Sequence, residues 1–573
     1  MKKQAEKQFI FRVRFIFACV VSVGFVLIAN LFFIQISNGD SFRSQADGQY
    51  VVSTYNSFER GSIFFEQIDG TRISAAGQRS GYKISINPSR FVADEDQVFE
   101  HLSSIIDIDK DRFYNAVSRT NRKYIEIAHQ VNQDDALSIK DLVGSAVQLH
   151  EERWRVYPLR GSAAHLLGFL GFRGDEYAGR YGLERQYEDT LKRESVDVYT
   201  NFFARVFHNV QDLVDPESLP EGDIVTTIDP QVQLFFEKEL RNIQDTWSSE
   251  SVGGIIMNPQ TGEIYSMGAF PNFDNNDFSQ ENISVFRNPI VENVYEFGST
   301  LKPLIIAMAM DNNNIDINTL QFFDEGSIQV EDRVINNFDN KGRGWVGVQD
   351  ILTQSLNTGM VHIVDQVPKA DFREYFDRFG FNEKTNIDLP NEGNNLTANL
   401  KSRRDIEFAN ISFGQGIAVT PISMIRGLSA LANNGKSALP HVVKRIEYTS
   451  GFSKNIDYLD AQEQVLEQET AAEVSRMLVN AFDEYRNGSV KFDNYSIAAK
   501  TGTAQIPDPS GGYYSDRNLH SFFGYFPAYD PEFIVLLYTV HPKEVRFASQ
   551  TLIDPFREVA KYLINYYTVV PDR

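Results

Sequence analysis

The chain has 573 residues, 42% hydrophobic and 23% charged, which are values of a globular protein with more than one domain. Its net charge of -22 argues against a nucleic-acid partner, because phosphates are bound by clustered Lys and Arg. A single cysteine, Cys19, excludes a disulfide framework and a cysteine-based metal site within one chain. The nine histidines are scattered and form no metal-ligand pattern.

Residues 15–34 form an uncharged run of 20 residues, the length that crosses the core of a bilayer. Five Lys or Arg residues precede this run. By the positive-inside rule we predict a cytoplasmic tail over 1–14, a transmembrane anchor over 15–34 and an extracytoplasmic body. The rival interpretation is a cleaved signal peptide, whose apolar region is usually only about 7–15 residues long. The expected location is therefore the cytoplasmic membrane, with a single pass.

Two domains are expected after the anchor. Residues 35–220 alternate short β-like runs with polar helical stretches and are predicted to be a mixed α/β domain, ending at a Pro/Gly-containing linker over 216–222. Residues 221–573 have predicted strands near both ends and a largely helical middle over 299–490. This order predicts an α+β fold in which an antiparallel sheet joins the N- and C-terminal strands and is covered by helices.

The start of the second domain contains two local signals. A helix is predicted to begin after Asp229, its cap, with Pro230 in the first position. A hairpin is predicted over 253–270, because two apolar runs flank the turn residues 258–262. The apolar face of the helix is predicted to consist of Val232, Leu234, Phe235 and Leu240.

Ser299 and Lys302 lie in YEFGSTLKPL, residues 295–304, where Pro303 indicates the first turn of a helix. Ser299 is therefore either a helix cap or a nucleophile. Lys302 lies one turn away on the same face, and burial or a second cation can lower its pKa enough for a general base. The spacing alone is weak evidence, because Ser80 and Lys83 repeat it in a strand-like stretch.

Two further motifs follow in the chain. Ser355-Leu356-Asn357 ends one helical turn and begins another, where the simpler interpretation is a helix cap. Lys500-Thr501-Gly502, with Thr503, lies on a predicted strand. A lysine, two hydroxyls and a glycine on a strand edge can bind a carboxylate while the substrate backbone approaches closely. The alternative is an edge strand that its lysine protects from pairing.

The order Ser-x-x-Lys, Ser-x-Asn, Lys-Thr-Gly is the signature of penicillin-binding proteins and class A β-lactamases. Nearly the whole chain resembles class B penicillin-binding proteins, which are monofunctional peptidoglycan D,D-transpeptidases. The similarity is carried by stretches such as FERGSIFFEQIDGTRISA, RVYPLRGSAAHLLGFLG and FGQGIAVTPISMIRGLSALANNG. The resemblance implies a membrane helix, an elongated non-catalytic pedestal over 35–220, and a transpeptidase domain over 221–573. Its antiparallel sheet is expected to have five strands.

The resemblance also implies roles for individual residues. Ser299 would attack the penultimate D-Ala of a stem peptide, Lys302 would accept its proton, and Ser355 would relay a proton to the leaving amine. Asn357 would bind the substrate amide, and Lys500, Thr501 and Thr503 its terminal carboxylate, beside Gly502. The backbone N–H groups of Ser299 and Thr503 would form the oxyanion hole. No metal or cofactor is implied.

The implied partners are lipid II-derived stem peptides, β-lactams as covalent inhibitors, other division proteins and a membrane glycosyltransferase of the FtsW/RodA type. TQSLNTG and the short pedestal resemble the division-specific FtsI type. The alternatives are an elongation-type transpeptidase, a D,D-carboxypeptidase or β-lactamase-like hydrolase, and a non-catalytic scaffold or β-lactam sensor. A hydrolase needs a carboxylate to position water, and no clear candidate is seen, although Glu392 stays open. A scaffold is disfavoured because all reacting residues are present. A sensor is disfavoured because it would need a cytoplasmic output domain, and only about 14 residues precede the predicted anchor.

Two residues depart from the family pattern close to the motifs. Phe297 stands where the family usually has proline, and Ala499 stands where it usually has glycine. We expect Phe297 to reduce rigidity before the nucleophile and Ala499 to narrow the strand by one methyl group. Neither change removes a reacting group.

Overall fold

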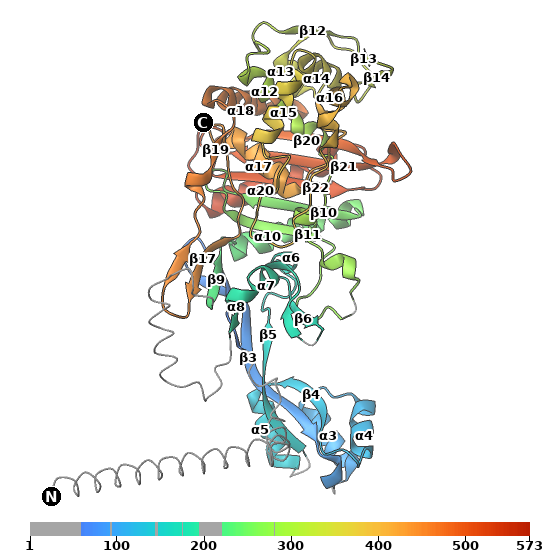
Figure 1. Cartoon of the computed structure of the whole chain (residues 1–573), viewed down its shortest axis with the longest axis vertical. Helices are drawn as coiled ribbons and strands as arrows, with labels where there is room; N and C mark the ends of the chain where they lie inside the picture. The colour runs from blue at the N-terminus through green and yellow to red at the C-terminus, as the bar shows by residue number, and fades with distance from the viewer. Residues whose placement is uncertain (1–58, 92–93, 144–146, 175, 194–220, 280) are drawn as a thin grey trace, which may run out of the picture. The chain divides into compact units, whose positions relative to one another are not determined.

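The computed structural model describes residues 59–91, 94–143, 147–174, 176–193, 221–279 and 281–573 (Figure 1). The predicted anchor over 15–34 lies outside these residues. Among the described helices, none combines the length and the apolar character needed to cross a membrane. The described chain packs as two compact units, one of residues 79–154 and one of residues 59–78 and 155–573. Packing thus divides the chain differently from the boundary expected near residue 220, and that boundary stays a prediction.

The smaller unit is built around the second half of β3 (Arg72–Ile86), which pairs with β4 (Ile125–Val131) and β5 (Val147–Val156). Its helices are α3 (Glu95–Ile105), α4 (Lys110–Ser118) and α5 (Gln133–Val143). Asp94 and Asp109 cap the first two helices by accepting backbone N–H groups. The Ser80–Lys83 repeat of the motif spacing lies here, and Lys83 pairs with Glu126 at 2.7 Å.

The larger unit contains a five-stranded antiparallel sheet in the order β11-β10-β22-β21-β20. Its strands are β10 (Ser251–Met257), β11 (Ile264–Phe270), β20 (Ala498–Pro507), β21 (Tyr513–Phe526) and β22 (Phe533–Val540). The N-terminal hairpin pairs directly with the C-terminal strands, as Ile255 opposite Leu536 illustrates. The predicted meeting of early and late strands is therefore confirmed. β20, which carries the Lys-Thr-Gly motif, is an edge strand.

Helices cover both faces of this sheet (Figure 1). On one face, α10 (Pro230–Trp247) and α20 (Ile553–Tyr566) bury Phe236, Leu240 and Phe556 against the strands. The other face is covered by α12 (Lys302–Asp311), α17 (Pro421–Ala432) and α18 (Gln468–Asp483). Asp229 caps α10 as predicted, by accepting from two backbone N–H groups. The predicted apolar face of α10 was wrong at Leu234, which is 45% exposed, because Phe236 points into the core instead.

Strand β9 (Gly222–Thr226) does not join the five-stranded sheet. It lies between β2 (Ile63–Glu66), which runs parallel to it, and β17 (Val443–Tyr448), which runs antiparallel to it. The early segment 59–78 is in this way built into the larger unit.

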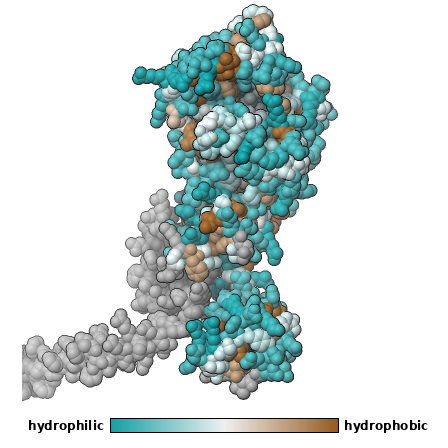
Figure 2. Space-filling model, turned by 90° about the vertical axis from the view of Figure 1, so that its right-hand side faces the viewer, coloured by the Kyte–Doolittle hydropathy of each residue, from teal (hydrophilic) through white to brown (hydrophobic). Residues whose placement is uncertain are grey.

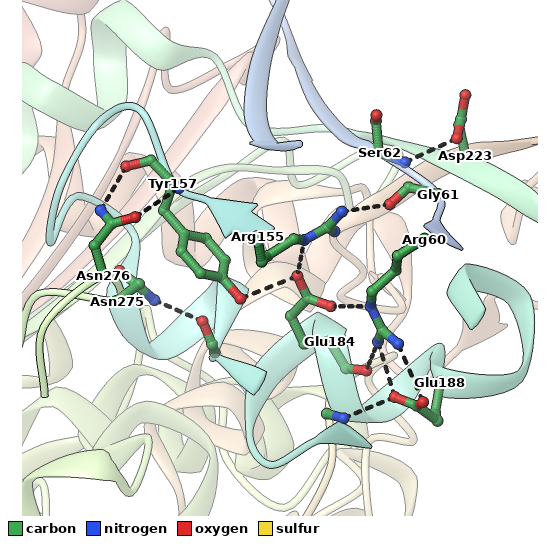
Figure 3. Close-up of polar contacts among 12 residues, drawn as sticks. Arg60, Gly61, Ser62, Arg155, Tyr157, Glu184, Glu188, Asp223, Asn275 and Asn276 are labelled. Carbon is green, nitrogen blue, oxygen red and sulfur yellow. Dashed lines mark hydrogen bonds and ion pairs between the residues drawn. The ribbon is translucent and has the colours of Figure 1, made fainter. Parts of the chain in front are cut away.

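A buried ionic network fixes this region (Figure 3). Glu184 accepts from Arg60 Nε and Arg155 Nε, both at 2.6 Å, and from the Tyr157 hydroxyl at 3.1 Å. Burial alone would raise the pKa of Glu184, but the two guanidinium groups outweigh it and hold that pKa below its ordinary value. Tyr157 also exchanges two backbone hydrogen bonds with the amide of Asn276, so the network reaches the loop after β11.

The segment between α12 and the next helix forms two small antiparallel ribbons. β12 (Gln321–Asp324) pairs with β15 (Gly344–Gly347), and β13 (Ser327–Val330) pairs with β14 (Arg333–Asn336). The helices that follow are α13 (Val348–Thr353), α14 (Asn357–Val364), α15 (Lys369–Arg378) and α16 (Asp405–Ile411), and α19 (Ala548–Thr551) follows β22. On the face seen in Figure 2, hydrophobic residues form small separate patches among hydrophilic ones.

Candidate active site

Ser299 lies in a 3₁₀ turn, Gly298–Leu301, that leads directly into α12. Pro303 occupies the first turn of α12, as predicted, so the serine is one turn before the α-helix proper. No side-chain capping bond is made at the start of either element. The structure therefore gives Ser299 no capping role, and its half-buried side chain lines a large cleft.

The turn that holds Ser299 is fixed by close backbone packing. Gly298 has φ +60°, and a Cβ on Gly414 would collide with the Gly298 carbonyl oxygen. The Phe297 carbonyl oxygen accepts from the Thr300 hydroxyl at 2.9 Å and from the Ser521 hydroxyl at 2.7 Å. The turn that contains Ser299 is thus joined to β21 by a hydrogen bond and to the loop at Gly414 by contact.

Lys302 is fully buried beneath the second motif. Its Nζ donates to the Ser355 carbonyl oxygen at 2.7 Å, to Ser355 Oγ at 3.3 Å and to Asn357 Oδ1 at 2.8 Å. Burial, and then repulsion by the charge of Lys500, hold the pKa of Lys302 well below its ordinary value. A lysine in these surroundings can be neutral near physiological pH and accept a proton.

Ser355 forms the turn between α13 and α14 with φ +56°, a left-handed conformation that is unfavourable for residues other than glycine. Asn357 begins α14, and neither residue caps it, because Leu356 occupies the cap position. The helix-cap interpretation of this motif is therefore wrong. Both side chains are half-buried and line the same cleft as Ser299.

The third motif lies on the edge strand β20. Lys500 is only 5% exposed, and burial lowers its pKa to about 8. A lysine that protects an edge would be exposed to solvent, so its burial argues against that alternative. Thr501 and Thr503 line the cleft, whereas Gly502 is buried where a Cβ would collide with the Phe297 carbonyl oxygen. A glycine at this position lets β20 approach the turn that contains Ser299.

The structure brings the three motifs together around one cavity of about 1320 Å³. Six of the eight predicted residues line it, and Lys302 lies beneath it. Gly502 is part of β20 and packs against the Phe297 carbonyl oxygen. The far wall carries Lys543 and Arg546 from the loop after β22. In the described part of the chain, no cluster of three His, Cys, Asp or Glu residues could hold a metal ion.

Three further residues named from the sequence do not line the cleft. Glu392 accepts from Thr385 N at 2.6 Å and Asn386 N at 3.0 Å, so its carboxylate closes a loop and does not line the cleft. Phe297 is buried, with its ring near Tyr538. Ala499 is buried in the core cluster with α20 and does not line the cleft.

Sequence reasoning missed two polar residues beneath the Ser-x-Asn turn, Asp324 and Asn337. They are 1% and 2% exposed and are connected by hydrogen bonds to each other and to α14. No motif marks them. The one available signal was a run of Asn and Asp in INNFDN just after an apolar strand position.

Comparison with known proteins agrees with this geometry. Residues 252–560 match the model of the penicillin binding protein transpeptidase domain, and residues 59–200 match that of the penicillin-binding protein dimerisation domain. Stage V sporulation protein D of Bacillus subtilis is 28% identical, over 93% of this chain and 82% of that protein. A peptidoglycan D,D-transpeptidase FtsI homolog of Mesostigma viride is 27% identical, over 95% and 94%.

The solved structures share the fold. The structure of penicillin binding protein 3 from Mycobacterium tuberculosis, complexed with aztreonam, has a TM-score of 0.68 at 19% sequence identity, covering 90% of this chain and 98% of that one. The matched transpeptidase model spans more than half of the chain, and the three motifs lie within it in one cleft. The chain belongs to the penicillin-binding protein transpeptidase family, as a class B member.

Proposed function

We propose that this protein is a serine-type peptidoglycan D,D-transpeptidase, and that Ser299 is its nucleophile. The observation that carries the proposal is the buried Lys302, which reaches both residues of the Ser-x-Asn motif and has a strongly lowered pKa. Such a lysine meets the requirement for a base beside a weakly nucleophilic hydroxyl. The relatives' printed names support the same activity.

In the first half-reaction, Ser299 Oγ attacks the carbonyl carbon of the penultimate D-Ala, and its proton passes to Lys302. The tetrahedral intermediate collapses, the bond to the terminal D-Ala breaks, and the leaving amine takes a proton through Ser355. Lys500, Thr501 and Thr503 hold the terminal carboxylate. The product is an ester between Ser299 and the shortened stem peptide.

In the second half-reaction, an amine from a neighbouring stem attacks this ester. An amide crosslink forms, and the Ser299 hydroxyl is regenerated with a proton from the attacking amine. A β-lactam mimics the D-Ala-D-Ala end and acylates the same serine. Its adduct is expected to be long-lived, because Glu392, the carboxylate considered for hydrolysis, is engaged by the Thr385–Asn386 backbone.

The test is covalent labelling with a fluorescent penicillin. Wild type and the Ser80→Ala control, which alters the repeated spacing in β3, are expected to label equally. Ser299→Ala is expected not to label at all. Labelling of Ser299→Ala would refute the assignment of the nucleophile, and rapid loss of the wild-type adduct would favour a hydrolase.

The cellular setting is part of the proposal. Residues 15–34 are proposed to anchor the chain in the cytoplasmic membrane with residues 1–14 in the cytoplasm, residues 35–220 as pedestal and residues 221–573 as the extracytoplasmic transpeptidase domain. The FtsI-type names among the relatives support a role at the division septum, beside a membrane glycosyltransferase of the FtsW/RodA type and other division proteins. Depletion in cells is expected to give filaments. Round cells would instead indicate an elongation-type enzyme.

A further inference from the structure

The Ser-x-Asn turn rests on the ribbon segment between α12 and α13. β12 and β14 of that segment lie against α14, whose first residue is Asn357 (Figure 1). From the other side, Lys302 holds the carbonyl oxygen of Ser355 and the amide oxygen of Asn357. The turn itself is left-handed at Ser355, so its shape depends on contacts from both sides.

Asn337 supplies the contact from the ribbon side. Its Oδ1 accepts from Asn357 N at 2.9 Å and from Thr358 N at 3.2 Å. These N–H groups open α14 and have no partner within the helix. The residue before Asn337 takes part as well, because the Asn336 carbonyl oxygen accepts from Asn357 Nδ2 at 3.1 Å. Asn357 is therefore held at its backbone N–H, at Nδ2 and, through Lys302, at Oδ1.

Asp324 in turn orients Asn337. Asn337 Nδ2 donates to both oxygens of Asp324, at 3.0 Å and 2.9 Å. Asp324 Oδ1 also accepts from Gly326 N at 2.9 Å and from the Thr358 hydroxyl at 2.8 Å. Because a carboxylate only accepts, it forces the amide of Asn337 to present its oxygen to α14. Both residues are almost fully buried, so water does not replace these contacts.

We propose that Asn337 and Asp324 are a positioning pair for the reaction, which keeps Asn357 and Ser355 in the geometry that Lys302 requires. The proposal rests on the proposed function, because it assigns the pair to the acylation of Ser299. Neither residue lines the cleft. Displacements of about 1 Å in such supports can lower a rate by about 100-fold.

The test measures the second-order rate of acylation by a penicillin, split into the non-covalent binding constant and the acylation rate constant, in the full chain. Asn337→Ala is expected to lower the acylation rate constant at least about ten-fold, with little change in the binding constant. The matched control is Asn275→Ala. Asn275 is equally buried and donates to the Ala164 and Gly168 carbonyl oxygens at 3.1 Å and 2.7 Å, but it does not line the cleft. Asn275→Ala is expected to lower the melting temperature without slowing acylation.

A charge-conserving exchange separates positioning from folding. The single variant Asn337→Asp places two carboxylates face to face, and its acylation rate constant is expected to be low. The double variant Asp324→Asn/Asn337→Asp exchanges the two side chains and keeps the total charge of wild type. The amide at 324 can then donate a hydrogen bond to the carboxylate at 337. The amide oxygen at 324 can still accept from Gly326 N and the Thr358 hydroxyl, and the carboxylate at 337 can still accept from α14. On a logarithmic scale, the double variant is expected to regain at least half of the acylation rate that Asn337→Asp loses.

Three results would overturn the proposal: Asn337→Ala acylating within two-fold of wild type, Asn275→Ala slowing as much as Asn337→Ala, or the exchange acylating no faster than Asn337→Asp. If Asn337→Ala does not fold, the comparison of Asn337→Asp with the exchange decides alone. Failure of the proposed function is a different outcome, in which wild type is not acylated or Ser299→Ala is acylated like wild type.

Discussion

Replacing Lys500 by arginine is expected to abolish the alkaline decline in the rate at which a penicillin acylates Ser299. Burial lowers the pKa of Lys500 to about 8, so this lysine is mostly charged at pH 7 and mostly neutral at pH 9. Its charged fraction falls about ten-fold over that interval. Because we assign the cation to the drug's carboxylate, the wild-type rate is expected to fall by the same factor of about 10.

Arginine stays protonated throughout this range, so the Lys500→Arg profile is expected to stay level above its acid limb. We assign the decline of the rate at low pH, the acid limb, to protonation of Lys302, whose pKa is lowered by burial and then by the charge of Lys500. Arginine at position 500 keeps the positive charge, so the acid limb of the Lys500→Arg profile is expected at the same pH as in wild type. Lys500→Gln removes the repulsion, which raises the pKa of Lys302 and moves the acid limb to higher pH.

The assay is the second-order acylation rate between about pH 6 and pH 10, with each profile scaled to its own maximum. Lys543→Arg, on the exposed wall of the cleft, is the matched control and is expected to keep both limbs of the wild-type profile. An alkaline decline of equal size in Lys500→Arg and wild type would refute the assignment of that limb to Lys500.

Three further outcomes are expected. Glu184→Gln is expected to lower the free energy of unfolding by about 3–5 kcal/mol, because two buried guanidinium groups lose their shared carboxylate; a loss below about 1 kcal/mol in urea unfolding would contradict this. Gly502→Ala is expected to abolish penicillin labelling while the chain stays folded, because the new Cβ overlaps the Phe297 carbonyl oxygen and pushes the turn that contains Ser299 away. Glu392→Gln is expected to leave the lifetime of the penicilloyl adduct unchanged, as measured by loss of label; a longer lifetime would restore Glu392 as the hydrolytic carboxylate.

The sequence was most informative where short-range chemistry decides the structure. Asp229 with Pro230 predicted the start of α10, and Pro303 placed Ser299 just before α12, because both signals act within one turn. The three motifs were recognisable because a fixed order of reacting side chains is rare by chance. These predictions needed no knowledge of what packs against each element.

The errors and omissions came from contacts between distant segments. Leu234 and Phe236 fit helical periodicity equally well, and the choice between them depends on the sheet beneath α10. β9 reads as a strand, but nothing local reveals that its partners are β2 and β17. Asn337 lies 20 residues from Asn357 in sequence, and its role follows only from the hydrogen bond between them.

The edge position of β20 has a consequence for self-association. An unpaired strand edge is a template on which other chains can aggregate. Here the edge lies along a cavity whose other walls come from the Ser355–Asn357 turn and from the loop that carries Arg546. A strand that belongs to a folded sheet brings its neighbouring strands with it, whereas an extended peptide needs room for one strand only. We therefore expect these walls to hinder pairing of β20 with the sheet of a second copy of the protein.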